Sequence, residues 1–125
     1  MKLSKTAAVL GTLSLLLGAA PAFAHAELVS STPAAGAKAS NVKSVTLTFD
    51  DPLMAPLSGL DIVMGAMPGM AAMKISGVKV AVGPGGKSLV ATLAKPLPAG
   101  SYDVNWHAVS DDNHRVTGKV SFTVK

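Results

Sequence analysis

His25 is the first candidate metal ligand, because of the segment that precedes it. Residues 1–24 are predicted to be a secretory signal peptide, with two early lysines, an apolar run over residues 7–20, and Ala22-Phe23-Ala24 as a small-x-small cleavage site. Cleavage after Ala24 makes His25 the first residue of the exported protein, so that its α-amine and its imidazole belong to one residue. Two nitrogens placed in this way form a chelate for a metal ion.

Asp112 and His114 form a second set of candidate ligands near the end of the chain. They are two residues apart, so in an extended stretch their side chains point to the same side. A carboxylate and imidazoles suit Cu(II) in a tetragonal N,O geometry, and together with the two nitrogens of His25 they make a square-planar set. The amine must lose a proton to bind, so we expect weaker affinity in acid.

Plainer interpretations of this second segment stay open. Asp111-Asp112-Asn113 is also typical of a polar turn, and His114 of an ordinary surface histidine. His107 lies in the middle of an expected strand and alternates with Trp106, so we expect it to be solvated or packed rather than a ligand.

A methionine-rich segment is the third candidate. Every methionine after Met1 lies between residues 54 and 73. The first of them is Met54, and the other four recur every three residues as Met64, Met67, Met70 and Met73. Thioether sulfur is a soft, neutral ligand that selects Cu(I). Gly65, Pro68 and Gly69 disfavour a helix, so a flexible loop that wraps such an ion is expected. A packing patch or a hydrophobic docking surface is the alternative.

Composition excludes several kinds of protein. The sequence has no cysteine, which rules out thiolate zinc sites, iron–sulfur clusters and blue-copper centres. The formal net charge of +4 includes two lysines of the predicted leader, so the exported domain is close to balanced and nucleic-acid binding is not indicated. Most remaining lysines are separated along the chain, as expected for a solvated surface: Lys38, Lys43, Lys74, Lys79, Lys87 and Lys95.

Residues 25–125 are predicted to form one all-β domain. Short β-rich runs recur between Gly, Pro, Asn and Asp, and about seven such runs suggest a two-sheet Greek-key sandwich. Trp106 is the expected core anchor, and Tyr102 after Pro98-Ala99-Gly100 is typical of a tyrosine corner. The expected strands are Glu27–Ser31, Ser44–Phe49, Leu60–Met64, Ile75–Val82, Ser88–Leu93, Tyr102–Val109 and Val116–Val124.

Three features together resemble the CopC family of periplasmic copper-binding proteins. They are the start His25-Ala26-Glu27-Leu28 with Ser31-Thr32-Pro33, the Met-x-x-Met run, and the block Trp106…Ser110-x-Asp112-x-His114…Gly118. The resemblance covers essentially the whole of residues 25–125. It implies a cupredoxin-like (Ig-like) Greek-key sandwich or barrel.

The resemblance also implies two copper sites and a cellular role. Cu(II) would be bound by His25, Asp112 and His114, and Cu(I) by a loop at the opposite end that holds Met64, Met67, Met70 and Met73. The family loop often includes a histidine, which this sequence lacks, so coordination by thioethers alone is expected. Family members are thought to pass copper to a membrane copper transporter or a periplasmic multicopper oxidase.

The sequence is therefore interpreted as a periplasmic copper carrier for homeostasis and resistance, without catalytic activity. We expect a monomer or a weak copper-linked dimer that does not span the membrane. One alternative is a copper oxygenase of the histidine-brace type, as in polysaccharide monooxygenases, but Asp112 would occupy a position that oxygen chemistry needs open. The sequence also has one Trp and one Tyr, a poor supply for stacking on sugars. A plain exported Ig-like module explains the strands but neither the methionine spacing nor the position of His25.

Overall fold

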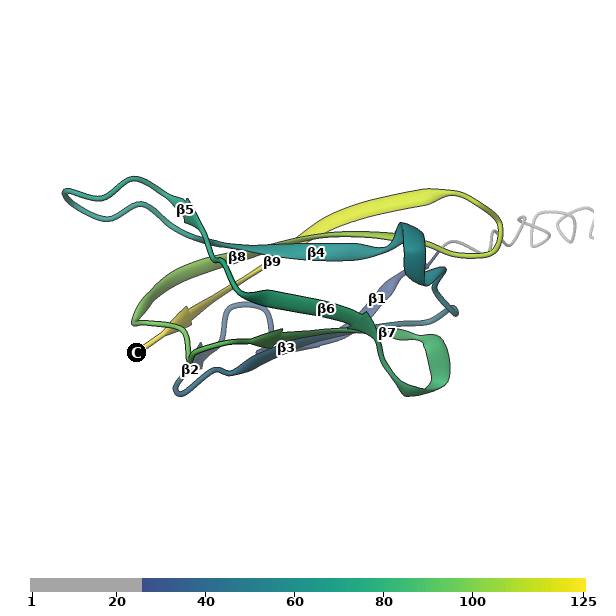
Figure 1. The fold of residues 1–125 in the computed structure, drawn as a ribbon, viewed down its shortest axis with the longest axis horizontal. Helices are drawn as coiled ribbons and strands as arrows, with labels where there is room; N and C mark the ends of the chain where they lie inside the picture. Colours follow the sequence, from purple (N-terminus) through teal and green to yellow (C-terminus); the bar gives the residue numbers. More distant parts are fainter. Residues whose placement is uncertain (1–25) are drawn as a thin grey trace, which may run out of the picture.

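The computed structural model describes residues 26–125, so the predicted signal peptide and His25 lie outside the described residues. The described chain is nearly all β and forms two sheets that lie face to face (Figure 1), which confirms the predicted sandwich. One sheet has the strand order β1-β3-β7-β6 and the other β2-β9-β8-β4-β5. The strands are β1 (Leu28–Thr32), β2 (Lys38–Ala39), β3 (Ser44–Phe49), β4 (Gly59–Met64), β5 (Met73–Lys74), β6 (Val78–Val82), β7 (Ser88–Leu93), β8 (Gly100–Val109) and β9 (Arg115–Val124). Two short 3-10 turns, Ala55–Leu57 and Pro84–Gly86, lie between strands.

The seven predicted strands are all present, and in every strand but one the boundaries differ from the prediction by at most two residues. The strand predicted from Ile75 begins only at Val78, because Gly77 has a φ of +73° and turns the chain. Two short strands, β2 and β5, were not predicted. Each has two residues, which is too short for an alternating pattern to appear in the sequence.

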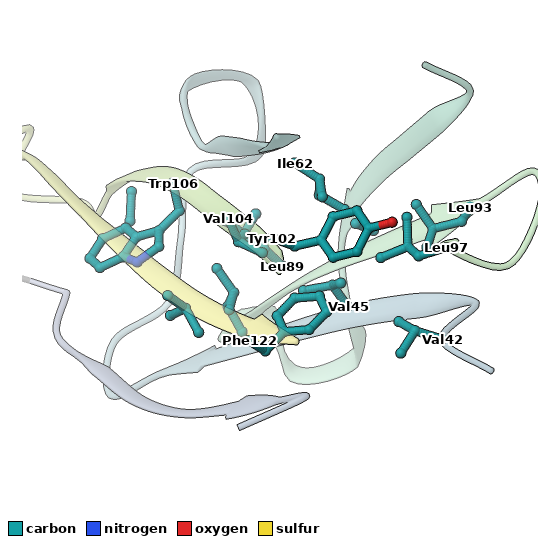
Figure 2. Packing of buried hydrophobic residues seen from close by; sticks show 14 of the residues in the cluster. Val42, Val45, Ile62, Leu89, Leu93, Leu97, Tyr102, Val104, Trp106 and Phe122 are labelled. Carbon is teal, nitrogen blue, oxygen red and sulfur yellow. The ribbon is translucent and has the colours of Figure 1, made fainter. Parts of the chain in front are cut away.

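The core lies between the sheets and follows the alternation of the long strands. Inward residues of β3 and β8 are buried while their neighbours are partly or fully exposed. Trp106 lies at one end of this core and Leu93 and Leu97 at the other (Figure 2). Phe49 meets Trp106 edge-on at 5.0 Å between ring centroids, a favourable aromatic geometry.

Tyr102 closes the other end of the core and confirms the predicted tyrosine corner. Its ring stacks on Phe122 at 5.7 Å, and its hydroxyl donates a hydrogen bond to the carbonyl of Pro98. Burial raises the pKa of the Tyr102 phenol above its ordinary value, so the hydroxyl stays protonated and keeps donating.

Gly118 is expected to be essential for packing, because the indole of Trp106 covers it. The two residues are paired across β8 and β9, and a Cβ on Gly118 would lie 2.7 Å from Trp106 Cε2. We expect Gly118→Ala to lower the free energy of unfolding by about 3 kcal/mol, since the rigid ring has to move. Urea unfolding measures the loss.

Gly65→Ala is the matched control for that substitution. Its Cβ would come no closer than 3.5 Å to Ser101 O, an ordinary contact. Equal stability of the Gly118→Ala variant and the wild type would contradict the packing described for Trp106.

The two long strands β8 and β9 give the domain two distinct ends. β8 has ten residues and therefore spans about 30 Å. One end holds the β8–β9 turn with residues 110–114, and the other holds the β4–β5 hairpin and the C-terminus (Figure 1). The candidate ligands Asp112 and His114 are thus far from the methionines of the hairpin.

Candidate metal centre

The β8–β9 turn holds the Asp112 carboxylate in a defined orientation. Asp112 Oδ1 accepts hydrogen bonds from the Ser110 hydroxyl at 2.8 Å and from the His114 backbone N–H at 3.1 Å. The Asn113 N–H donates to the Ser110 carbonyl at 3.0 Å, which closes a turn around Asp111 and Asp112. Asn113 itself has a φ of +66°, a conformation that Asn tolerates. Ser110 is fully buried, so the turn is anchored to the core from one side.

The second oxygen of Asp112 lies beside the His114 imidazole. Asp112 Oδ2 and His114 Nδ1 are 3.4 Å apart, and the two side chains are 23% and 63% exposed. The structure therefore brings together the two ligands predicted two residues apart, with the imidazole open to solvent. A carboxylate and an imidazole at this spacing are donors that suit Cu(II).

Hydrogen bonding keeps Asp112 ionised. The backbone N–H of His114 is the largest cause that holds the pKa of this carboxyl below its ordinary value of 3.8, and the Ser110 hydroxyl is the next. Since the pKa is lower in the folded state, the ionised carboxylate stabilises the folded turn when the pH is above the ordinary pKa of 3.8. That contribution is lost as the pH falls through the lowered pKa.

Ser110→Ala is expected to raise the pKa of Asp112 toward its ordinary value, because one donor to the carboxylate is removed. The pKa should stay below that value, since the larger contribution of the His114 N–H remains. An NMR titration of the Asp112 carboxyl carbon in metal-free protein measures the change. Ser121→Ala removes a distant hydroxyl that donates to Asp103 at 2.6 Å and should leave Asp112 unchanged. An identical titration of Asp112 in the Ser110→Ala variant would contradict the role given to the hydroxyl.

The start of the described chain lies next to this turn. Ala26 and Glu27 line one surface hollow together with His114 and its neighbours on β9. Within residues 26–125, no group of three or more His, Cys, Asp or Glu side chains is arranged to hold a metal ion. Ala26 follows His25 directly in sequence, so the described chain begins beside His114, one residue after the predicted ligand His25.

Asp51 is a carboxylate near the same end that sequence reasoning missed. Its Oδ2 is buried and has no hydrogen-bond partner in the described part of the chain. Its neighbour Asp50 accepts a hydrogen bond from the Glu27 N–H at 2.8 Å, which ties this segment to the start of β1. A buried carboxylate oxygen without a partner is costly, so a cation at this end would stabilise it. Asp50-Asp51-Pro52 is an ordinary turn sequence, and nothing in it signals such a role.

His107 lies on a different surface from His114. It is half-buried on the outer face of the five-stranded sheet, where it is paired with Gly59 and Thr117. A Cβ on Gly59 would lie 3.3 Å from His107 Cε1, so the ring packs over the glycine. Packing is one of the two environments that the sequence predicts for His107, the other being solvent.

The methionine segment forms a β-hairpin that projects beyond the other strands (Figure 1). Met67 and Met70 exchange two backbone hydrogen bonds of 2.9 and 2.8 Å around Pro68-Gly69, and Gly69 has a φ of +81°. Proline followed by a positive-φ glycine is the signature of a type II turn. The predicted loop is confirmed, and the three-residue spacing does not reflect a helix.

The hairpin pairs each sheltered methionine with an exposed one. Met64 is opposite Met73, and Met67 is opposite Met70. Met64 is 6% exposed and Met67 packs partly against the core, whereas Met70 and Met73 are each 46% exposed. The Met64 methyl group fills the space over Gly100, so its thioether points into the core.

Met54 is separated from the hairpin methionines. Its N–H donates to the Val109 carbonyl at 2.8 Å, at the end of the domain that carries the Asp112 turn. The fold therefore divides the methionines that the sequence shows as one window.

The fold and its candidate metal ligands define a class of protein. It is a small β-sandwich with a carboxylate and an imidazole at one end and thioethers at the other. The chain belongs to the CopC family, because the CopC domain model matches residues 28–125. It is 45% identical over 127 residues to Copper resistance protein C of Pseudomonas syringae pv. tomato, with 100% of both chains covered. It is 43% identical over 111 residues to Copper resistance protein C of Xanthomonas campestris pv. juglandis, with 87% of each covered.

A solved structure shows the same fold. The crystal structure of PcoC, described as a methionine-rich copper resistance protein from Escherichia coli, superposes with a TM-score of 0.76 at 41% identity. The match covers 82% of this chain and 100% of that one. The predicted family and the cupredoxin-like β-sandwich are therefore confirmed.

Proposed function

We propose that this protein binds copper in the periplasm and serves copper homeostasis and resistance. The observation that carries this proposal is the pairing of Asp112 Oδ2 with His114 Nδ1 at 3.4 Å, beside the hollow that Ala26 and Glu27 line. Family membership and relatives named Copper resistance protein C support the same conclusion.

Cu(II) is proposed to bind at His25, Asp112 and His114. The amine and imidazole of His25 and the imidazole of His114 would supply three nitrogens, and Asp112 one oxygen. Asp112 is anionic at physiological pH, since its pKa lies below the already low ordinary value of a carboxyl group. Asp51 lies at the same end of the domain, where its buried Oδ2 has no hydrogen-bond partner among the described residues, so a nearby cation would offset the cost of that burial.

Cu(I) is proposed to bind at Met64, Met67, Met70 and Met73 in the hairpin. Met70 and Met73 are accessible in the structure, and Met67 lies directly across from Met70. Met64 would have to withdraw its side chain from above Gly100 to bind, so it is the least accessible ligand of the set. Soft thioethers without nearby carboxylates favour Cu(I) over harder divalent ions.

Delivery to a membrane copper transporter or a periplasmic multicopper oxidase completes the proposal. No helix within residues 26–125 is long and apolar enough to cross a membrane. We propose a monomer that associates weakly through copper, because the exposed imidazole of His114 is accessible to a second molecule.

A binding role without catalysis is favoured over the histidine-brace oxygenase. Asp112 stands beside His114, where it would occupy the coordination position that oxygen needs. An assay for oxidised oligosaccharides in the presence of copper and a reductant distinguishes the two. Such products would overturn the carrier proposal.

Native mass spectrometry of the exported protein tests the proposed function. We expect a chain that begins at His25 and retains one Cu(II), and a second copper after reduction without oxygen. A protein that retains no copper from an equimolar supply, or one that retains zinc equally well, would overturn the proposal.

A further inference from the structure

The tip of the β4–β5 hairpin is apolar and largely exposed. Residues 62–73 contain no charged or hydrogen-bonding side chain. Met70 and Met73 are each 46% exposed, and the residues between Pro68 and Lys74 are all exposed. This tip extends past the ends of the neighbouring strands (Figure 1), so it can contact or insert into a second surface while the body of the domain stays outside it. Contiguous apolar surface of this kind marks a binding site.

Five exposed lysines lie at the end of the domain that carries this hairpin and form a basic collar, made of Lys38, Lys43, Lys74, Lys79 and Lys95. The sequence suggested that they are dispersed, but the strand ends gather them on one end of the domain. Lys74 follows Met73 in β5, and Lys79 is the second residue of β6. Lys43 and Lys95 flank the ends of β3 and β7. Lys38 pairs with Thr123 beside the start of β8.

The basic collar is continuous with the apolar tip. Met73, Lys74 and Lys95 line a single surface hollow together with Ile75 and Leu97. Apolar and cationic groups are therefore presented on one surface rather than on separate faces.

Acidic side chains gather at the opposite end of the domain. Glu27, Asp50 and Asp51 lie near the start of β1, and Asp111 and Asp112 lie in the β8–β9 turn. Among residues 26–125, the acid closest to the hairpin along the sheet is Asp103, opposite Val63. Asp103 is engaged by Lys119 at 4.0 Å and by Ser121 at 2.6 Å, so it does not neutralise the basic collar.

Copper binding does not account for the basic collar. Positive charges around the hairpin repel a copper cation and would weaken a Cu(I) site. An acidic protein surface would satisfy the lysines but would leave the apolar tip without a matching environment. An anionic lipid bilayer satisfies both, since apolar groups enter the acyl boundary while lysines remain at the phosphates.

We propose that the β4–β5 hairpin docks this protein on anionic phospholipid membranes, with the apolar tip inserted and the basic collar against the headgroups. One weak apolar anchor and one basic patch together give stable but reversible attachment. The Asp112–His114 turn would then face away from the bilayer, about 30 Å along β8. The proposal does not depend on copper, so metal-free protein tests it.

Vesicle co-sedimentation of the exported, metal-free protein is the test, after its mass confirms that the apolar leader is absent. We expect binding to vesicles of equal parts phosphatidylglycerol and phosphatidylcholine, and little to phosphatidylcholine alone. Binding should fall steeply between about 0.01 M and 1 M salt, as the screening length drops from about 30 Å to about 3 Å. Lys74→Gln/Lys95→Gln should lower the partition coefficient about tenfold or more.

Two further variants distinguish the contributions of the apolar tip, the basic collar and the overall net charge to vesicle binding. Met70→Gln/Met73→Gln keeps every charge and should also weaken binding, because the inserted surface becomes polar. Lys87→Gln/Arg115→Gln removes the same number of positive charges from the acidic end and should bind like the wild type. Absence of binding to the phosphatidylglycerol vesicles at low salt would overturn the proposal and point to an acidic protein instead. Equal losses in the two charge variants would overturn it as well.

Discussion

Adding one alanine before His25 is expected to weaken Cu(II) binding by about a hundredfold or more, which corresponds to about 3 kcal/mol. The extended chain keeps the His25 imidazole, Asp112 and His114. It removes only the amine from the position where it shares a chelate ring with the imidazole. Competition titration against a chelator of known Cu(II) affinity measures the change at constant pH.

Matched variants show whether the loss belongs to the proposed site. His25→Ala and Asp112→Asn should each lower the Cu(II) affinity, because each removes a proposed ligand. His107→Ala should leave it unchanged, since His107 packs over Gly59 on another face. An alanine-extended protein with the affinity of the wild type would contradict a site built on the N-terminal amine.

Replacing both exposed hairpin methionines is expected to remove most Cu(I) affinity. Met70→Leu/Met73→Leu keeps side-chain volume and apolar character while it deletes two accessible thioethers. We expect a loss of about a hundredfold or more, measured without oxygen against a chromogenic Cu(I) chelator. Cu(II) binding at the other end should not change, because the two places are about 30 Å apart.

Met54 and Met64 provide the controls for the Cu(I) experiment. Met54→Leu changes a methionine that lies at the Asp112 end, so Cu(I) affinity should be unaffected. Met64→Leu should cost less than the double substitution, since the Met64 thioether points into the core over Gly100. Full Cu(I) retention by Met70→Leu/Met73→Leu would contradict the thioether site.

The long strands could be predicted because their pattern depends on burial alone. Val45, Leu47 and Phe49 alternate with threonines, and the structure buries one set between the sheets. The tyrosine corner was predictable too, since Tyr102 follows Pro98-Ala99-Gly100 at a characteristic spacing. The Asp112–His114 pair was predicted from the same period of two, but the structure brings these side chains together through the β8–β9 turn, in which Asn113 has a φ of +66°, and not along an extended strand.

Other features depend on which strand ends meet, and the local sequence does not encode that. Met64 has the same spacing as Met67, yet its position at the end of β4 turns it into the core beside Tyr102. Asp51 belongs to an ordinary turn sequence, and only the packing around it leaves an oxygen without a partner. Likewise, the lysines of the basic collar are distant in sequence and come together through the sandwich topology.

A crystal structure of the exported protein loaded with Cu(II), with anomalous diffraction recorded at the copper edge, tests the central claim most directly. We predict one strong anomalous peak bound by the His25 amine and imidazole, the His114 imidazole and the Asp112 carboxylate. A peak bound elsewhere, or a copper held by His114 without His25, would contradict the proposed site.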